Sequence, residues 1–193
     1  MGSKKLKAIA VKGEIPLQLA DKAAADRTKK EYLAEFNKGD FAKRFRKYGT
    51  SSSGKPSALS GDSPVKNWGG IGVNDFSTPE GLSGDAAIAN VDKKENCWHC
   101  TLSCQALLKE GTGEYKYQAG VRRPEYETQA SFGTMCLNDN TESIAMANDI
   151  CNRYGMDTIS AGCAIAFAME CYENGILTNE DTGGIELRWG DHR

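Results

Sequence analysis

The chain of 193 residues is 39% hydrophobic and 26% charged, with a formal net charge of −2, which is typical of a soluble globular protein of one or two domains. No apolar run approaches the roughly 18 residues that span a bilayer, and the first residues, MGSKKLKAIAVKG, favour neither a signal peptide nor a myristoylation signal. We therefore expect a cytoplasmic protein without a membrane partner. The mild acidity also disfavours nucleic acid as a partner.

The first predicted element is a strand at residues 5–12, KLKAIAVK. No partner strand precedes it, which indicates a missing neighbour. Residues 20–39 are rich in helix formers and end at a glycine, so they predict a helix. Asp40 is the expected cap of a second helix that carries Phe41, Phe45 and Tyr48 on one face.

Residues 50–85 are rich in Gly, Ser, Pro and Asp and predict a long irregular loop. So long a loop is usually functional or packed against something absent. Two further helices are expected at residues 140–154 and 158–174, each followed by a glycine. The second is apolar almost all round, which predicts a buried helix.

A possible phosphate-binding loop occurs at residues 49–56, GTSSSGKP. It matches G-x-x-x-x-G-K-[ST] except at the last position, where Pro56 replaces the hydroxyl. A helix rather than a strand is expected before it, so a nucleotide site is disfavoured.

The clearest chemical motif is ENCWHCTLSC, residues 95–104, which contains Cys97, Cys100 and Cys104. The spacing C-x-x-C-x-x-x-C suits three corners of a [4Fe-4S] cluster whose fourth ligand comes from elsewhere. Structural zinc is the main rival, and unligated thiols are a third possibility. His99 is as easily a turn residue as a ligand. The remaining cysteines form no C-x-x-C pair and offer no obvious fourth ligand: Cys136, Cys151, Cys163 and Cys171.

Two carboxylates follow two arginines in RRPEYETQ, residues 122–129. Glu125 and Glu127 have two interpretations. They could belong to a surface ion-pair patch, which is common, or one could move a proton near a reacting centre. Spacing alone does not decide between these.

Several stretches together resemble the tungsten-containing aldehyde ferredoxin oxidoreductase family. The resemblance covers nearly the whole chain in the family's order. Its segments are MGSKKLKAIAVKG, SPVKNW at 63–68, CWHCTLSC at 97–104, PEYET at 124–128, NRYGMDTISAG at 152–162, AIAFAMECYENG at 164–175 and ELRWGD at 186–191.

The resemblance implies an enzyme that oxidises an aldehyde with water to a carboxylic acid. Electrons would pass from a tungsten or molybdenum bis-pterin centre to a [4Fe-4S] cluster and on to ferredoxin. Cys97, Cys100 and Cys104 would be cluster ligands, and Glu127 would be the proton-transfer carboxylate.

The family's pterin-contacting motif D-x-x-G-L-D aligns with residues 152–157, NRYGMD. Asp157 keeps the carboxylate, whereas Asn152 and Met156 depart from the pattern. Asn152 can therefore offer a hydrogen bond but no charge. A helix that begins near Asp157 would also present free amides to the polar parts of a pterin.

The resemblance further implies a mainly α fold, with residues 1–13 as the strand remnant of a preceding pterin-binding domain and residues 14–193 as the helical region. The preceding domain and a distal cluster cysteine would be missing. We therefore expect a fragment that is inactive alone and associates with the missing domain or a second copy. The alternatives are a non-catalytic electron-transfer module and a family member that reduces an aromatic thioester.

Overall fold

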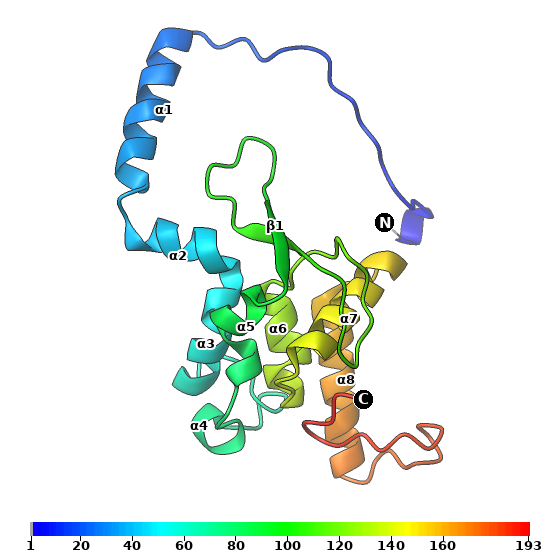
Figure 1. Ribbon diagram of the computed structural model, residues 1–193. Helices are drawn as coiled ribbons and strands as arrows, with labels where there is room; N and C mark the ends of the chain where they lie inside the picture. The colour runs from blue at the N-terminus through cyan, green and yellow to red at the C-terminus, as the bar shows by residue number, and fades with distance from the viewer. Residues whose placement is uncertain (1) are drawn as a thin grey trace. The chain divides into compact units, whose positions relative to one another are not determined.

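Helices dominate residues 2–193, which the computed structural model describes (Figure 1). This confirms the expected mainly α fold. The chain divides into two units, one up to Asn37 and one from Lys38 to Arg193. Each unit is described separately below.

The first unit contains a short 3-10 helix, η1 (Gly2–Lys4), and the helix α1 (Lys22–Phe36). The Asp21 carboxylate accepts a hydrogen bond from the amide of Ala24 at 2.8 Å, so it caps α1 and confirms a helix here. The strand expected at residues 5–12 is wrong, because no strand pairing in the described chain includes these residues. An extended segment without a paired neighbour forms no ladder of hydrogen bonds.

The second unit starts with a series of short helices. They are α2 (Asp40–Tyr48), η2 (Gly49–Ser53), α3 (Gly54–Ser60), α4 (Gly72–Asp75), η3 (Glu80–Leu82) and α5 (Gly84–Ile88). Asp40 lies in the first turn of α2, and Gly39 is the N-cap. The expectation that Asp40 caps this helix is therefore wrong, although Phe41 and Phe45 do stack on one face.

The long irregular loop expected at residues 50–85 is also corrected by the structure. Its short helices bury Ala58, Val65 and Leu82, which form one core cluster with Phe132 and Ile144. These few buried apolar side chains pack the segment, although its Gly-rich and Ser-rich composition predicted an unpacked loop. The segment thus has its packing partners within the second unit.

A two-stranded antiparallel hairpin follows α5. It consists of β1 (Val91–Glu95) and β2 (Gln105–Leu108), with Glu95 opposite Gln105 and an irregularity between Val91 and Lys93. The loop at residues 96–104 joins the two strands and carries the cysteine motif. The sequence did not predict this hairpin, because VDKKE shows no apolar alternation.

The last helices form the packed centre of the second unit. They are α6 (Tyr126–Phe132), η4 (Thr134–Cys136), α7 (Thr141–Tyr154) and α8 (Thr158–Glu173). Figure 1 shows α6, α7 and α8 close together. The Asn140 and Asp157 side chains cap α7 and α8, and Gly155 ends α7 with φ +67°. Both helices were correctly predicted.

The expectation that α8 is buried all round is wrong. Gly162, Ala166 and Met169 are buried, but Phe167 on another face is 63% exposed. Only one side of α8 packs against described elements, chiefly α6. Among residues 2–193, no helix combines the length and apolar character needed to cross a bilayer.

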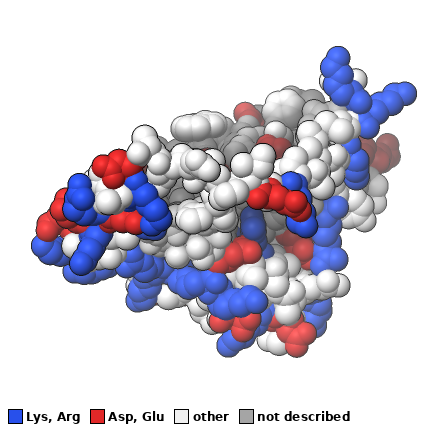
Figure 2. Space-filling model, turned by 90° about the horizontal axis from the view of Figure 1, so that it is seen from above, with Lys and Arg blue, Asp and Glu red and all other residues white. Residues whose placement is uncertain are grey.

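Charged side chains of both signs are interspersed over the face drawn in Figure 2. On α1, for example, Lys22 and Asp26 form an ion pair at 2.6 Å. This is the arrangement expected for helix faces in water. The locally basic segment between residues 27 and 47 therefore does not require a nucleic-acid partner.

Candidate functional site

The motif cysteines lie together in the loop between β1 and β2. Cys97 is exposed, whereas Cys100 and Cys104 are half-buried. The amide of Cys100 donates to the carbonyl of Cys97 at 3.0 Å, and this hydrogen bond closes a turn between these two cysteines. His99 and Ser103 have φ values of +55° and +53°, so the backbone is left-handed at the residue before Cys100 and at the residue before Cys104.

The three sulfur atoms share this loop but do not converge on one point. Within residues 2–193, no group of at least three His, Cys, Asp or Glu side chains is placed to hold a metal ion. His99 behaves as a turn residue, and its ring contacts the ring of Trp98. The ligand roles of Cys97, Cys100 and Cys104 therefore remain predictions.

The electrostatic surroundings of the thiols differ along the loop. Hydrogen bonds from the backbone of Ser103 and Leu102 lower the pKa of Cys100. Burial raises the pKa of Cys104, and the negative charges of Glu125, Cys100 and Cys97 raise it further. The thiolate is the form that binds a metal, and these opposite shifts make Cys100 more readily ionised than Cys104. A cation would relieve the repulsion at Cys104.

Arg123 lies beneath the cysteine loop. Its side chain is 1% exposed, and its Nη2 donates to the carbonyl of Cys104. Burial lowers the pKa of Arg123, whereas Glu125 and the Cys104 thiolate oppose that shift. The sequence placed Arg123 in a possible surface patch, but it is a buried cation next to the third cysteine.

Glu125 is also only partly exposed to solvent. Its carboxylate accepts hydrogen bonds from the Thr50 hydroxyl and, at 2.6 Å, from the Gln105 side-chain amide. Because Gln105 is the residue after Cys104, Glu125 ties the start of α6 to the cysteine loop. Of the RRPEYETQ charges, only Arg122 forms a surface ion pair, with Glu95 at 2.8 Å.

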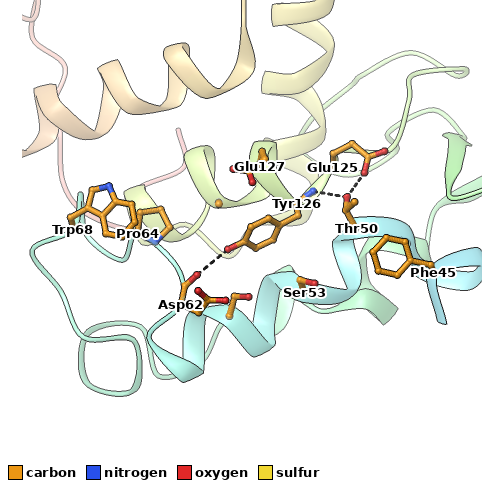
Figure 3. Close-up of a pocket in the computed structure, with 11 residues that line it drawn as sticks. Phe45, Thr50, Ser53, Asp62, Pro64, Trp68, Glu125, Tyr126 and Glu127 are labelled. Carbon is orange, nitrogen blue, oxygen red and sulfur yellow. Dashed lines mark hydrogen bonds between the residues drawn. The ribbon is translucent and has the colours of Figure 1, made fainter. Parts of the chain in front are cut away.

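A cavity of about 660 Å³ opens beside the start of α6 (Figure 3). Its charged lining residues are all acidic: Asp62, Glu125 and Glu127. Its aromatic lining residues are Phe45, Trp68 and Tyr126. Pro64, Ala130 and the hydroxyl side chains of Thr50, Ser53 and Ser57 complete the wall.

The Tyr126 phenol helps to shape this cavity. It donates to the carbonyl of Asp62 at 3.2 Å, and its own amide donates to the Thr50 hydroxyl at 2.9 Å, as Figure 3 shows. Glu127 follows in the first turn of α6 and is exposed. The sequence-predicted carboxylate therefore lies in a cavity wall, which is a position compatible with proton transfer.

Of the predicted pterin contacts, Asn152 lies in the last turn of α7, whereas Met156 and Asp157 lie between α7 and α8. Asn152, Met156 and Asp157 are all exposed. The Asp157 carboxylate accepts a hydrogen bond from the amide of Ser160 at 2.7 Å, which lowers the pKa of Asp157. The Asn152 amide donates to Asn148 at 3.2 Å. Asp157 therefore lies at the positive N-terminal end of α8, whereas Asn152 lies at the C-terminal end of α7.

Close helix packing brings this turn next to Glu127. The hydroxyl groups of Thr128 on α6 and Thr158 on α8 are 2.9 Å apart. A Cβ atom at Gly162 would lie 2.6 Å from the Ser131 Cβ, so glycine allows the two helices to approach. The structure thus places the N-terminal ends of α6 and α8 together.

The cysteines outside the loop are placed as expected for structural residues. Cys136 and Cys151 are buried, and Cys163 and Cys171 are half-buried. Burial raises the pKa of Cys136 to about 12, so it stays a neutral thiol near pH 7. The segment GTSSSGKP follows helix α2 rather than a strand, which is the wrong context for a phosphate-binding loop.

The residues in and beneath the loop are chemically suited to an iron–sulfur cluster. The donor set offers three thiols on a tightly turning backbone. Beneath it, Nε and Nη1 of the buried Arg123 have no hydrogen-bond partner among residues 2–193. Unpaired buried donors of this kind suit the negative charge of a thiolate-bound cluster.

Comparisons with known proteins agree with this picture. The chain matches the family model "Aldehyde ferredoxin oxidoreductase, domains 2 & 3" over residues 27–193. It is similar to the tungsten-containing aldehyde ferredoxin oxidoreductase of Thermococcus kodakarensis, with 34% identity over 99% of this chain and 31% of that protein. The protein of the same name from Pyrococcus abyssi is 34% identical over 95% of this chain and 29% of its own length.

A third relative has a different name. The WOR-like subunit of an aliphatic sulfonate oxidoreductase from Pyrococcus furiosus is 33% identical over the whole chain and 30% of its own length. These relatives are all named as oxidoreductases or subunits of one. Specifically, the chain belongs to the aldehyde ferredoxin oxidoreductase family. It spans about 30% of the length of these relatives.

Proposed function

We propose that this chain supplies the cluster-binding loop and one wall of the pterin site of a tungsten-dependent, aldehyde-oxidising enzyme. The observation that carries the proposal is the hairpin loop with Cys97, Cys100 and Cys104, which is tied through Glu125 to an acidic cavity. Family membership supports the assignment, and two relatives are named as tungsten-containing enzymes.

The three cysteines would hold a [4Fe-4S] cluster, whose fourth ligand is not assigned. Because Cys97 is the exposed member, its end of the loop faces solvent, where an acceptor such as ferredoxin can approach. Arg123 and Cys104 lie at the opposite, more buried end. The loop would therefore lead from the interior of the second unit to its surface.

A bound tungsten bis-pterin centre would supply two-electron oxidation of an aldehyde, with water as the source of the added oxygen. Glu127 would accept or return a proton at its carboxylate during this reaction. Asn152 and Asp157 would orient polar groups of the pterin, and Met156 would contact it through its exposed thioether side chain. The N-terminal end of α8 would favour negative groups there.

A second candidate is an oxidoreductase with another substrate. It is favoured by the similarity to the protein named as an aliphatic sulfonate oxidoreductase subunit. The cavity wall described above has no basic residue among its lining side chains, which is unfavourable for an anionic sulfonate. We therefore place the aldehyde first. A non-catalytic electron-transfer module and an aromatic thioester reductase remain alternatives.

Substitution of single cysteines tests the cluster assignment. Cys100→Ser should abolish the visible absorbance that anaerobic reconstitution with iron and sulfide produces, because it removes one thiolate ligand. Cys171→Ser is the matched control, since Cys171 is a half-buried cysteine outside the loop. Equal cluster uptake by both variants and the unaltered chain would contradict the proposal.

A further inference from the structure

Arg123 is a buried cation with incomplete hydrogen bonding. Only Nη2 donates to a described acceptor, the carbonyl of Cys104 at 2.5 Å. Nε and Nη1 have no hydrogen-bond partner among residues 2–193. Burying a charge without such partners is strongly unfavourable. The site is therefore organised for a group beyond the side chains already described.

The backbone makes room for this guanidinium. Gly49 has φ +63°, and a Cβ atom there would lie 2.0 Å from Nη2 of Arg123 and 2.5 Å from the carbonyl oxygen of Cys104. A side chain at position 49 would therefore displace either the arginine or the cysteine loop. Gly49 permits the close contact between the cation and the third cysteine.

The charges nearby indicate what the free donors face. The charged or ionisable groups near Arg123 are the Glu125 carboxylate, the Cys104 thiol and the Lys94 ammonium. The Glu125 carboxylate already accepts hydrogen bonds from Thr50 and Gln105. The contact of Arg123 with the Cys104 carbonyl places its guanidinium next to the third cysteine of the candidate metal loop.

We propose that Arg123 is a positioning residue for the iron–sulfur cluster, holding the Cys104 end of the loop and directing a fixed positive charge and N–H donors toward the cluster. This inference rests on the proposed cluster. Adding an electron makes the cluster more negative, so a nearby cation stabilises the reduced form and raises the reduction potential. Arg123 then acts through the cluster ligands and not on substrate.

Redox titration of the reconstituted chain tests this role. Arg123→Met should lower the equilibrium constant for one-electron reduction by roughly tenfold or more, which equals a fall of about 59 mV. Arg123→Lys keeps a positive charge and should therefore lower the reduction potential less than Arg123→Met does. Arg122→Met, at the exposed neighbour, should leave the potential unchanged. A potential that is the same in Arg123→Met and the unaltered chain would overturn the proposal.

Thermal unfolding of the cluster-free chain gives a second, independent test. Methionine removes the unpaired buried donors, so Arg123→Met should melt at the same or a higher temperature than the unaltered chain. A clearly lower melting temperature would show that Arg123 only supports the fold. Failure of the unaltered chain to take up iron and sulfide would contradict the proposed function and the Arg123 role together, whereas normal uptake with an unchanged potential in Arg123→Met would overturn the Arg123 role alone.

Discussion

At the residue scale, the segment RRPEYETQ shows how differently neighbouring charges are used. Arg122 pairs with Glu95 at the surface, whereas Arg123 is buried against the carbonyl of Cys104. Glu125 is held by neutral donors, and Glu127 lines the cavity. The sequence indicated the charges but not their depth, because depth depends on the contacts with Gly49 and the cysteine loop, which are distant in sequence.

Glu127 gives the first prediction at this scale. In the holoenzyme that contains this chain, Glu127→Gln should reduce kcat by roughly 100-fold, because the amide cannot transfer a proton. Metal content, measured on the same samples, should not change. Glu180→Gln, at an exposed carboxylate of the C-terminal region, is the control. Unchanged turnover in Glu127→Gln would rule out the proton-transfer role.

Asp157 gives a prediction about pH. The pKa of Asp157 lies below its ordinary value of 3.8 because the carboxylate interacts with the Ser160 side chain and accepts a hydrogen bond from the Ser160 amide. The resulting stabilisation is present above pH 3.8 and is lost as the pH falls through the lowered pKa of the folded state. Asp157→Asn keeps an N-cap acceptor but no charge. Its urea midpoint should therefore lie below that of the unaltered chain at pH 7, and the difference should shrink near pH 2. A difference independent of pH would contradict this role.

At the scale of single elements, strong local signals were predicted well. α7 and α8 have both an N-cap side chain and a following glycine, and their ends were correct within a residue or two. The hairpin β1–β2 and the short helices after Tyr48 were missed. Their stability depends on contacts far apart in sequence, such as Val65 and Leu82 with Phe132, and local composition does not report such contacts.

The contact between α6 and α8 gives a prediction at the same scale. Gly162→Ala would place a Cβ atom 2.6 Å from the Ser131 Cβ and should lower the free energy of unfolding by about 1–3 kcal/mol through overpacking. Phe167→Ala, on the exposed side of α8, should change it by less than about 0.5 kcal/mol. Urea unfolding of both variants checks this. Equal stability of Gly162→Ala and the unaltered chain would show that α6 and α8 can move apart without lowering the free energy of unfolding.

At the scale of the whole molecule, the family and the mainly helical fold were both predicted correctly from the residue patterns. It also predicted a fully buried α8, which the structure corrects: Phe167 and Ile165 remain substantially exposed. An apolar pattern indicates what a helix could bury but not which partners are present. The chain spans about 30% of the length of its relatives.

The same consideration predicts the activity of the chain alone. Aldehyde-dependent reduction of a viologen dye should be absent from the 193 residues by themselves, because the proposed pterin contacts Asn152, Met156 and Asp157 are exposed and form only one wall. Activity should appear when the remaining parts of the enzyme are present. Robust turnover by the isolated chain would contradict the view that its site is incomplete.

The central claim is that the loop with Cys97, Cys100 and Cys104 holds an iron–sulfur cluster. Its most direct test is iron, sulfide and zinc analysis of the chain purified without oxygen. We expect roughly four iron and four sulfide per chain, with little zinc. Stoichiometric zinc without sulfide would contradict it and identify a structural zinc site instead.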